Sequence, residues 1–220
     1  MIRLYAIPVS TSCARTRIVL DHKAIAYDEL PPPDGYASNE YKRIIATGTV
    51  PGMVIDDLKV SDSATQVELL EELFPDTPMM PTEPFARARV RSIAAFHDTR
   101  LEPSVRALFG LVKPVSERKQ AKIETGCSLF AQRLEMLDQI VTPSPFLAGQ
   151  LFSHADAAFP TTLRMGMSIC DALNYDISLT EKLKNWLAEL NKVPAVKASL
   201  DLNTKAVSDW ISSKVDLQKT

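Results

Sequence analysis

The sequence predicts an α/β domain at the N-terminus followed by an all-α domain. Three observations support this fold class. A strand, a helix and a second strand are predicted within the first thirty residues, and a β-hairpin pattern surrounds the pair Asp56-Asp57. Beyond a proline-rich segment, the apolar periodicity is helical throughout. The length of 220 residues alone would allow one large domain or two smaller ones.

The first unit is a strand, a helix and a strand. The segment 2–7 (IRLYAI) is a short apolar run that Pro8 ends, and 14–25 then places apolar residues at spacings that a helix buries on one face. Residues 26–30 form the second strand, which three consecutive prolines end. A unit of this length implies a parallel strand pair with a right-handed crossover.

A hairpin completes the predicted sheet. A second helix is expected over roughly 38–45, and two short apolar runs, 53–55 and 58–60, then flank two turn-forming aspartates. After the hairpin the period changes to that of an amphipathic helix, which ends before Pro75. The predicted order is therefore βαβ, α, ββ, α.

The segment 75–84 carries four prolines in ten residues, a composition that favours an extended connector over a helix. We therefore predict a first domain over 1–78, a linker over 79–86 and a helical domain over 87–220, with a kink near Pro103. The helical patterns cover 85–112, 116–141, 154–173, 179–191, 194–200 and 205–214.

Composition excludes several classes of protein. Hydrophobic residues make up 45% of the chain and charged residues 24%, which is typical of a globular protein. A net charge of -2 gives no field that would attract nucleic acid, so no nucleic-acid partner is expected. The N-terminal apolar run is too short and interrupted for a signal peptide or a membrane span, so we expect a cytoplasmic protein without a membrane partner.

The three cysteines, Cys13, Cys127 and Cys170, are widely spaced and odd in number. They form no C-x-x-C pair, and no histidine lies near them at the spacing of metal ligands. The sequence therefore supports neither a disulfide framework nor a zinc site, and no metal is expected.

Three motifs follow one another in an order that carries a resemblance. They are 49-TVPGMVIDD-57, 61-SDSATQVELLEELFP-75 and 147-LAGQLFSHADAAFPTTL-163. Together with the two-domain layout, they resemble the cytosolic glutathione transferase family over nearly the whole chain. The resemblance implies a thioredoxin-like N-terminal domain (βαβ-α-ββα), a helical C-terminal domain and glutathione as substrate or cosubstrate.

The third motif has a structural explanation. Ser153 and Asp156 fit a capping box at a helix start, which contributes about 1 kcal/mol and needs no ligand. Asp62 and Ser63 also lie at a predicted helix start, where capping alone would explain them. The resemblance implies more: Ser63 and its N–H hold the γ-glutamyl carboxylate of glutathione, and Asp62 holds its ammonium group, in place of the more usual Glu.

The segment Thr49, Val50 and Pro51 is the expected binding site for the rest of the peptide. The resemblance implies a cis Val50-Pro51 bond and pairing of the Val50 backbone with glutathione as an added strand. The chain has 46-ATGT-49 where many members have Asn-Pro-x-Gly/Lys, so a side chain that often contacts the glycine carboxylate is missing. Lys42 or Arg43 is the alternative partner for that carboxylate.

The loop before the first helix holds the candidate catalytic residues Ser10, Ser12 and Cys13. A thiol with a pKa of about 8.5 needs a hydrogen-bond donor to be held as thiolate at neutral pH. When 15-RTRIVL-20 is aligned with the family's helix motif, Ser10 takes the place of the catalytic Ser of zeta- and tau-like classes and of the Cys of omega-like members. Ser10 is the first choice and Ser12 the second. Cys13 is an alternative only if it is exposed, since a buried free cysteine is inert.

Arg15 and Arg17 lie on the same predicted helix. One of them is a candidate for steadying the thiolate, and a solvated or structural role is at least as consistent with the sequence. The second substrate is expected against 96–110, where His97, Arg100, Arg106 and Phe109 are the candidate lining residues. The apolar character of this segment favours a hydrophobic electrophile.

The resemblance leaves several functions open. The first is a glutathione transferase that activates the glutathione thiolate for attack on a hydrophobic electrophile, as a homodimer whose sites border the partner subunit. A zeta-like glutathione-dependent isomerase is a variant of it, although Thr49 stands where that class has Gln. The others are a non-catalytic binding or regulatory protein of the same fold and a thioltransferase that acts through Cys13.

Overall fold

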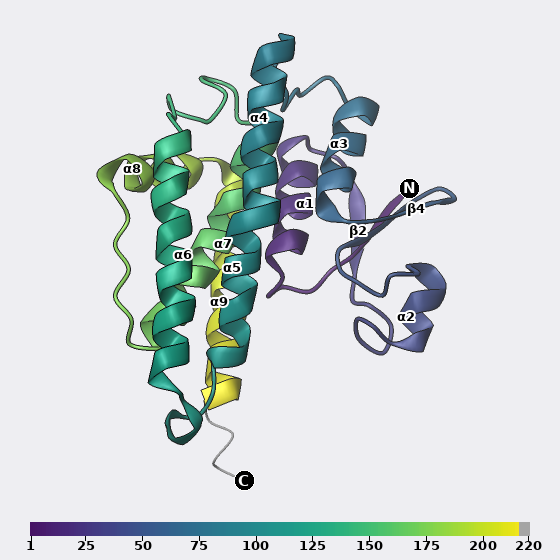
Figure 1. Cartoon of the computed structure of the whole chain (residues 1–220). Coiled ribbons are helices and arrows are strands. Elements are labelled where there is room, and N and C mark those ends of the chain that lie inside the picture. Colours follow the sequence, from purple (N-terminus) through teal and green to yellow (C-terminus); the bar gives the residue numbers. More distant parts are fainter. Residues whose placement is uncertain (216–220) are drawn as a thin grey trace.

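The computed structural model describes residues 1–215 and contains a small mixed sheet with three helices beside a larger bundle of helices (Figure 1). In Figure 1 α1 (Thr11–His22) lies beside the bundle, whereas α2 (Asn39–Ile44) lies on the side away from it. The third helix of this part, α3 (Ser63–Leu73), packs against α1.

The sheet has the strand order β2-β1-β3-β4. The β1 strand (Ile2–Tyr5) pairs in parallel with β2 (Tyr27–Leu30) and antiparallel with β3 (Gly52–Ile55), which pairs antiparallel with β4 (Leu58–Ser61). The predicted parallel unit and the predicted hairpin are both confirmed.

The two central strands, β1 and β3, bury side chains on both faces of the sheet. Leu4 packs in the main core, which continues into the helical bundle, and its neighbour Tyr5 belongs to a second small cluster with Tyr41, Ile45 and Val54. Successive side chains of a strand point to opposite faces, so β1 contributes to both clusters. The main core thus joins the sheet, α1 and the bundle.

The first helix begins earlier than the sequence pattern predicts. Residues 14–25 were the expected helix, whereas α1 begins at Thr11 because the Ser10 side chain accepts a hydrogen bond from the Cys13 amide (3.2 Å) and caps the helix. The helix ends at His22, and Ala24 follows with a positive φ of 53°. The polar loop residues are therefore part of the helix start.

The helical part contains α4 to α9. Their bounds are α4 (Pro84–Phe96), α5 (Glu102–Leu108), α6 (Gln120–Ile140), α7 (His154–Ala172), α8 (Glu181–Leu190) and α9 (Pro194–Val215), with 3-10 turns at Phe109–Leu111 and Val115–Glu117. A π-helical turn, His97–Leu101, joins α4 to α5. The break expected near Pro103 is this turn, and Pro103 lies in the first turn of α5, where a missing N–H costs little.

One long helix, α9, replaces the two short helices predicted over 194–200 and 205–214. Asn203 lies in the predicted gap and is completely buried. Its side chain donates hydrogen bonds to carbonyl groups of the loop before α1, so tertiary contacts favour a continuous helix through residues that are polar in the sequence.

The predicted domain limits stay a prediction, and 216–220 of the predicted helical domain lie outside the described residues. The connector 74–83 separates α3 from α4, as the prolines indicate. Within residues 1–215, no helix is both long and apolar enough to cross a bilayer.

Candidate functional site

Three segments of the first domain are joined by one buried side chain, Gln66 of α3. Its Oε1 accepts a hydrogen bond from the Thr16 hydroxyl of α1 (2.8 Å), and its Nε2 donates to the carbonyl oxygens of Pro51 (3.0 Å) and Val60 (2.8 Å). All three hydrogen bonds of this amide reach other parts of the domain, so Gln66 fixes α1, α3 and the segment before β3 relative to one another.

The segment before β3 consists of Thr49, Val50 and Pro51. Val50-Pro51 is a cis peptide bond, and the strand pairing of β3 begins only at Gly52, so the backbone groups of Val50 lie beyond the sheet ladder. The Tyr41 hydroxyl of α2 donates a hydrogen bond to the Thr49 carbonyl oxygen (2.9 Å), and this bond fixes the segment against α2. A Cβ at Gly52 would come within 2.3 Å of that hydroxyl, so only glycine allows this packing.

The start of α3 carries Asp62 and Ser63. Asp62 has a positive φ of 90°, which is unusual for a residue with a side chain, and its Oδ1 accepts hydrogen bonds from the amides of Ala64 (3.0 Å) and Thr65 (3.2 Å). Because both bonds use Oδ1, the Oδ2 atom of this exposed side chain stays available to a ligand cation. Ser63 is largely buried at the first position of the helix.

The three candidate catalytic residues at the start of α1 differ in their exposure to solvent. Ser10 and Ser12 are half-buried, whereas Cys13 is fully buried. Burial raises the pKa of the Cys13 thiol, and a buried neutral thiol is a poor nucleophile. Ser10 accepts a hydrogen bond from the Cys13 amide through its side-chain oxygen, and this bond does not use its O–H.

The loop that leads to Ser10 is held by a residue from the far end of the chain. Asn203 of α9 donates from Nδ2 to the carbonyl oxygens of Pro8 (3.0 Å) and Val9 (3.1 Å). The sequence analysis did not identify Asn203 or Gln66. A polar residue inside an otherwise helical apolar pattern is the signal that could have drawn attention to each.

Both arginines of α1 are buried in ion pairs. Arg15 donates to both carboxylate oxygens of Asp98 (2.9 and 3.1 Å), and Arg17 forms a two-point contact with Glu29 (2.8 and 2.7 Å). These paired contacts give both guanidinium groups structural partners. Arg15 thereby links α1 to the π-helical turn of the second domain.

His97 lies inside the protein and not on an open wall. Its Nδ1 is 2.8 Å from Asp98 Oδ1 and its Nε2 is 2.9 Å from the Thr162 hydroxyl of α7. Burial lowers the pKa of His97. One chain of contacts thus runs from α1 to α7 through Arg15, Asp98, His97 and Thr162. His97 therefore lies in the interior of the protein, whereas the sequence predicts it in the wall of a pocket.

The other predicted pocket residues lie nearer the surface. Arg100 and Arg106 are exposed; Arg106 pairs with Glu102 and lies 5.8 Å from the centroid of the Phe109 ring, and Phe109 packs against Trp210 of α9 at 5.2 Å. Phe109 also lines a cavity of about 350 Å³.

A larger cavity, of about 810 Å³, lies elsewhere in the helical domain, between α7, the segment 174–179, α8 and α9. None of the predicted second-substrate residues lines it. The size of this cavity therefore does not identify it as the place of the chemistry, since the polar groups that could hold a thiol peptide are in the first domain.

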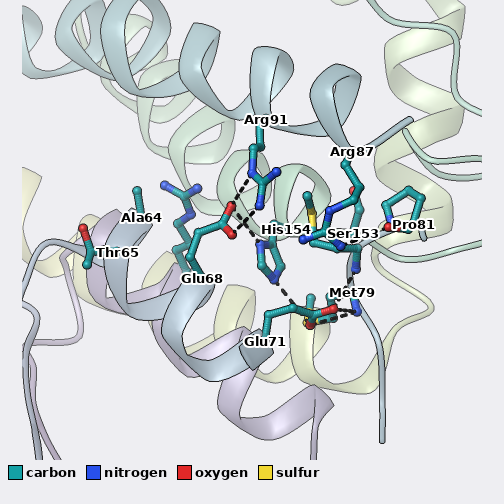
Figure 2. Close-up of polar contacts among 12 residues, drawn as sticks. Ala64, Thr65, Glu68, Glu71, Met79, Pro81, Arg87, Arg91, Ser153 and His154 are labelled. Atoms are coloured by element: carbon teal, nitrogen blue, oxygen red, sulfur yellow. Dashed lines mark hydrogen bonds and ion pairs between the residues drawn. The ribbon is translucent and has the colours of Figure 1, made fainter. Parts of the chain in front are cut away.

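A second polar cluster holds the two domains together around His154, at the start of α7 (Figure 2). Its ring lies between two carboxylates of α3, with Nδ1 3.9 Å from Glu68 and Nε2 3.6 Å from Glu71. Arg91 of α4 forms a two-point contact with Glu68, and Lys23, the residue after α1, lies 2.7 Å from Glu71.

The two carboxylates of this cluster are strongly acidic. The nearby His154 ring and the hydrogen bonds from Arg91 lower the pKa of Glu68 to about 2. Burial opposes ionisation of Glu71, but the nearby His154 ring, the Lys23 ammonium group and the hydrogen bond from the Met79 amide outweigh it and hold the pKa at about 2. In residues 1–215, no group of three or more His, Cys, Asp or Glu side chains is arranged to hold a metal ion.

Comparison with known proteins agrees with this geometry. Residues 4–78 match the family model described as glutathione S-transferase, N-terminal domain. The whole described chain has the glutathione transferase fold, a thioredoxin-like domain followed by an all-helical domain.

Individual relatives differ in what their names describe. Over 144 residues the chain is 32% identical to a stringent starvation protein A homolog from Pasteurella multocida; this is 66% of the chain but only 65% of that relative, so the chain spans just under two thirds of it. Over 220 residues it is 27% identical to a probable glutathione S-transferase from Zea mays, with 90% of each chain covered.

A solved structure shows the same fold at lower identity. The theta class glutathione S-transferase from the citrus canker pathogen Xanthomonas axonopodis pv. citri, with glutathione bound, superposes with a TM-score of 0.76 at 20% identity and covers 90% of this chain and 96% of its own.

Proposed function

We propose that this protein is a glutathione transferase that holds glutathione as a thiolate for attack on a hydrophobic electrophile. The observation that carries the proposal is the Gln66 network, which joins the Val50-Pro51 segment, α1 and the first turns of α3. Each of these three segments offers a group that a thiol peptide with a γ-glutamyl end requires.

The peptide backbone of glutathione is expected to bind along Val50. The Val50 backbone groups lie beyond the β3 ladder, and the cis bond to Pro51 sets their direction. An extended peptide can pair with such groups as a short added strand. Thr49 is exposed beside it, with its hydroxyl 2.9 Å from that of Thr47.

The γ-glutamyl end is expected to bind at the start of α3. Its carboxylate would meet the Ser63 hydroxyl and the positive end of the helix dipole, and its ammonium group would meet Asp62 Oδ2. The strained backbone at Asp62 is consistent with a residue positioned for a ligand.

Ser10 is the proposed thiolate partner. Its oxygen accepts from the Cys13 amide, so its O–H can donate to the glutathione sulfur, and the positive end of α1 adds to the stabilisation of negative charge. A thiol with a pKa of about 8.5 then becomes largely ionised at neutral pH. Ser12, two residues after Ser10 in the first turn of α1, is also half-buried and is the second choice.

The electrophile is expected to bind on the helical side of the site. Of the residues considered there, Arg100, Arg106 and Phe109 have the exposure that this role needs, and His97 is the least suited. A cytoplasmic homodimer, in which the partner subunit borders the site, is part of the proposal, on the strength of the family resemblance.

Calorimetric titration with glutathione is the first test. Binding by the wild-type protein and loss of about 10-fold or more in affinity in Ser63→Ala are expected, since a charge-assisted hydrogen bond contributes about 1.5–3 kcal/mol. Rates with a chlorodinitrobenzene-type electrophile then separate the serines. Ser10→Ala should lose about 100-fold in rate, as removal of an oxyanion donor does, while Ser12→Ala retains most of it. An unchanged rate in Ser10→Ala refutes the assignment.

A non-catalytic binding or regulatory function is the second candidate. The similarity to the stringent starvation protein A homolog and the missing side chain in 46–49 favour it. Absence of glutathione binding by the wild-type protein would select it. A zeta-like isomerase remains a variant of the first candidate, whereas the burial of Cys13 argues against a thioltransferase that acts through this residue.

A further inference from the structure

Two cysteines that are far apart in the sequence meet inside the helical domain. Cys127 of α6 and Cys170 of α7 are separated by 43 residues, and their sulfur atoms lie 3.2 Å apart, with the Cys170 thiol donating to Cys127. Both are buried and both are free thiols. Neither contributes to the proposed glutathione site, which lies in the other domain.

The close approach follows from the packing of the two helices. Gly166 lies one turn before Cys170 and Phe130 lies one turn after Cys127, so these four residues form one contact face. A Cβ at Gly166 would come within 2.4 Å of the Phe130 ring. Glycine therefore allows α6 and α7 to pack closely at the position where the two sulfur atoms meet.

We propose that Cys127 and Cys170 are an oxidation site, at which a hydroperoxide converts the two thiols into a disulfide that joins α6 to α7. The sulfur atoms need to approach from 3.2 Å to about 2.05 Å, which rotation of the side chains and a small shift of the helices provide. This inference does not depend on glutathione binding.

The order of the steps follows from the hydrogen bond between the thiols. Burial raises the pKa of both, but the hydrogen bond that Cys127 accepts favours its thiolate, so Cys127 reacts first. The thiolate attacks one oxygen of hydrogen peroxide, an S–O bond forms as the O–O bond breaks, and hydroxide leaves and takes up the proton that Cys127 released.

The Cys170 sulfur then attacks the sulfenic acid sulfur of Cys127. An S–S bond forms, the S–O bond breaks, and the oxygen leaves as water with the Cys170 proton. In sum, two thiols lose two electrons and two protons, and one hydrogen peroxide is reduced to two waters. The raised pKa values make this a slow reaction, which is expected to need sustained exposure to peroxide.

A cavity lies beside the turn of α7 that carries Cys170. The α7 residues Ser168 and Asp171, on either side of Cys170 in the chain, line the cavity of about 810 Å³. A molecule of the size of hydrogen peroxide can therefore reach the same turn of α7, and only local opening is needed to reach the sulfur. The helix α7 also carries His154, whose ring lies between Glu68 and Glu71 of the first domain.

The test uses the full-length, reduced protein exposed to hydrogen peroxide. Thiols are then counted after unfolding, and peptides are mapped by mass spectrometry without reductant. The wild-type protein has three thiols. We expect one thiol to remain, a cross-linked peptide pair containing Cys127 and Cys170, recovery of all three thiols with dithiothreitol, and a rise in Tm of about 5 °C or more.

Matched variants locate the reaction. Cys127→Ala and Cys170→Ala should each form no cross-link, while Cys13→Ala should form it as the wild type does, because Cys13 has no sulfur neighbour among the described residues. If all three thiols persist, or if they are lost as separate sulfinic acids without a cross-link, the proposal is wrong. The wild-type result decides even if a variant fails to fold.

Discussion

Replacing Glu71 by Gln tests the polar cluster that holds the two domains together. Glu71 accepts hydrogen bonds from the amides of Met79 and Met80 (3.1 Å each), and its carboxylate lies 2.7 Å from Lys23, whose side chain is fully buried. Gln keeps the shape but removes the charge. It leaves Lys23 without a carboxylate partner and turns an amide NH₂ toward groups that donate.

The size of the effect follows from the acidity of Glu71. A carboxyl whose pKa falls from its ordinary value of 4.5 to about 2 stabilises the folded state above pH 4.5. At about 1.4 kcal/mol per pKa unit this gives about 3 kcal/mol as an upper limit. Allowing for solvent at this partly exposed group, we expect a loss of about 2 kcal/mol in the free energy of unfolding and a fall in Tm of about 4–8 °C.

The pH dependence separates charge from packing. The folded-state pKa of Glu71 is depressed, so its contribution is complete above the unfolded pKa and is lost as the pH falls from 4.5 toward about 2. Urea unfolding of wild type and Glu71→Gln at about pH 7 and about pH 3.5 should therefore show a difference that shrinks in acid. A difference that is equal at both pH values refutes the electrostatic explanation. Glu72→Gln, at the exposed neighbouring position, is the control and should change stability by less than about 0.5 kcal/mol.

Three other substitutions test buried polar residues whose partners the fold supplies. Asn203→Ala removes two hydrogen bonds from the loop before Ser10. It should lower the conjugation rate about 10-fold with little change in glutathione affinity. Equal losses in rate and in affinity would contradict a positioning role. Gln66→Leu removes the hydrogen bond to the Pro51 carbonyl oxygen. It should weaken glutathione binding by about 10-fold or more in calorimetry. An unchanged affinity would show that the Gln66 network does not order the site. Asp156→Asn disturbs a carboxylate with four hydrogen bonds and should destabilise the protein by about 2–4 kcal/mol in urea unfolding; unaltered stability would refute this.

Local signals in the sequence account for most of the element order. The hairpin turn at Asp56-Asp57 and the helix start at Ser153 are set by residues within four positions of one another, and the structure contains both. The residue before the first helix is a further case: the sequence shows a run of small polar residues, and the structure makes Ser10 the cap. Such interactions can be read from the chain because they do not depend on the rest of the fold.

Residues that act across long separations could not be found in this way. Asn203 reaches Pro8 across 195 residues, and its place in a polar stretch led to a predicted break in what is one helix. His97 resembled a pocket residue on an amphipathic helix, but packing against α7 buries it. The cysteine spacing gave no sign that Cys127 and Cys170 would meet.

The sequence by itself thus determined the order of strands and helices and the residues that cap them, because hydrogen bonding at a helix end and apolar periodicity are local. The tertiary structure decided which polar groups are buried together: Gln66 between α1, α3 and Pro51, and His154 between Glu68 and Glu71. Burial in contact with a distant element removes water from a polar group and obliges it to find a partner, and the identity of that partner is fixed only when the chain has folded.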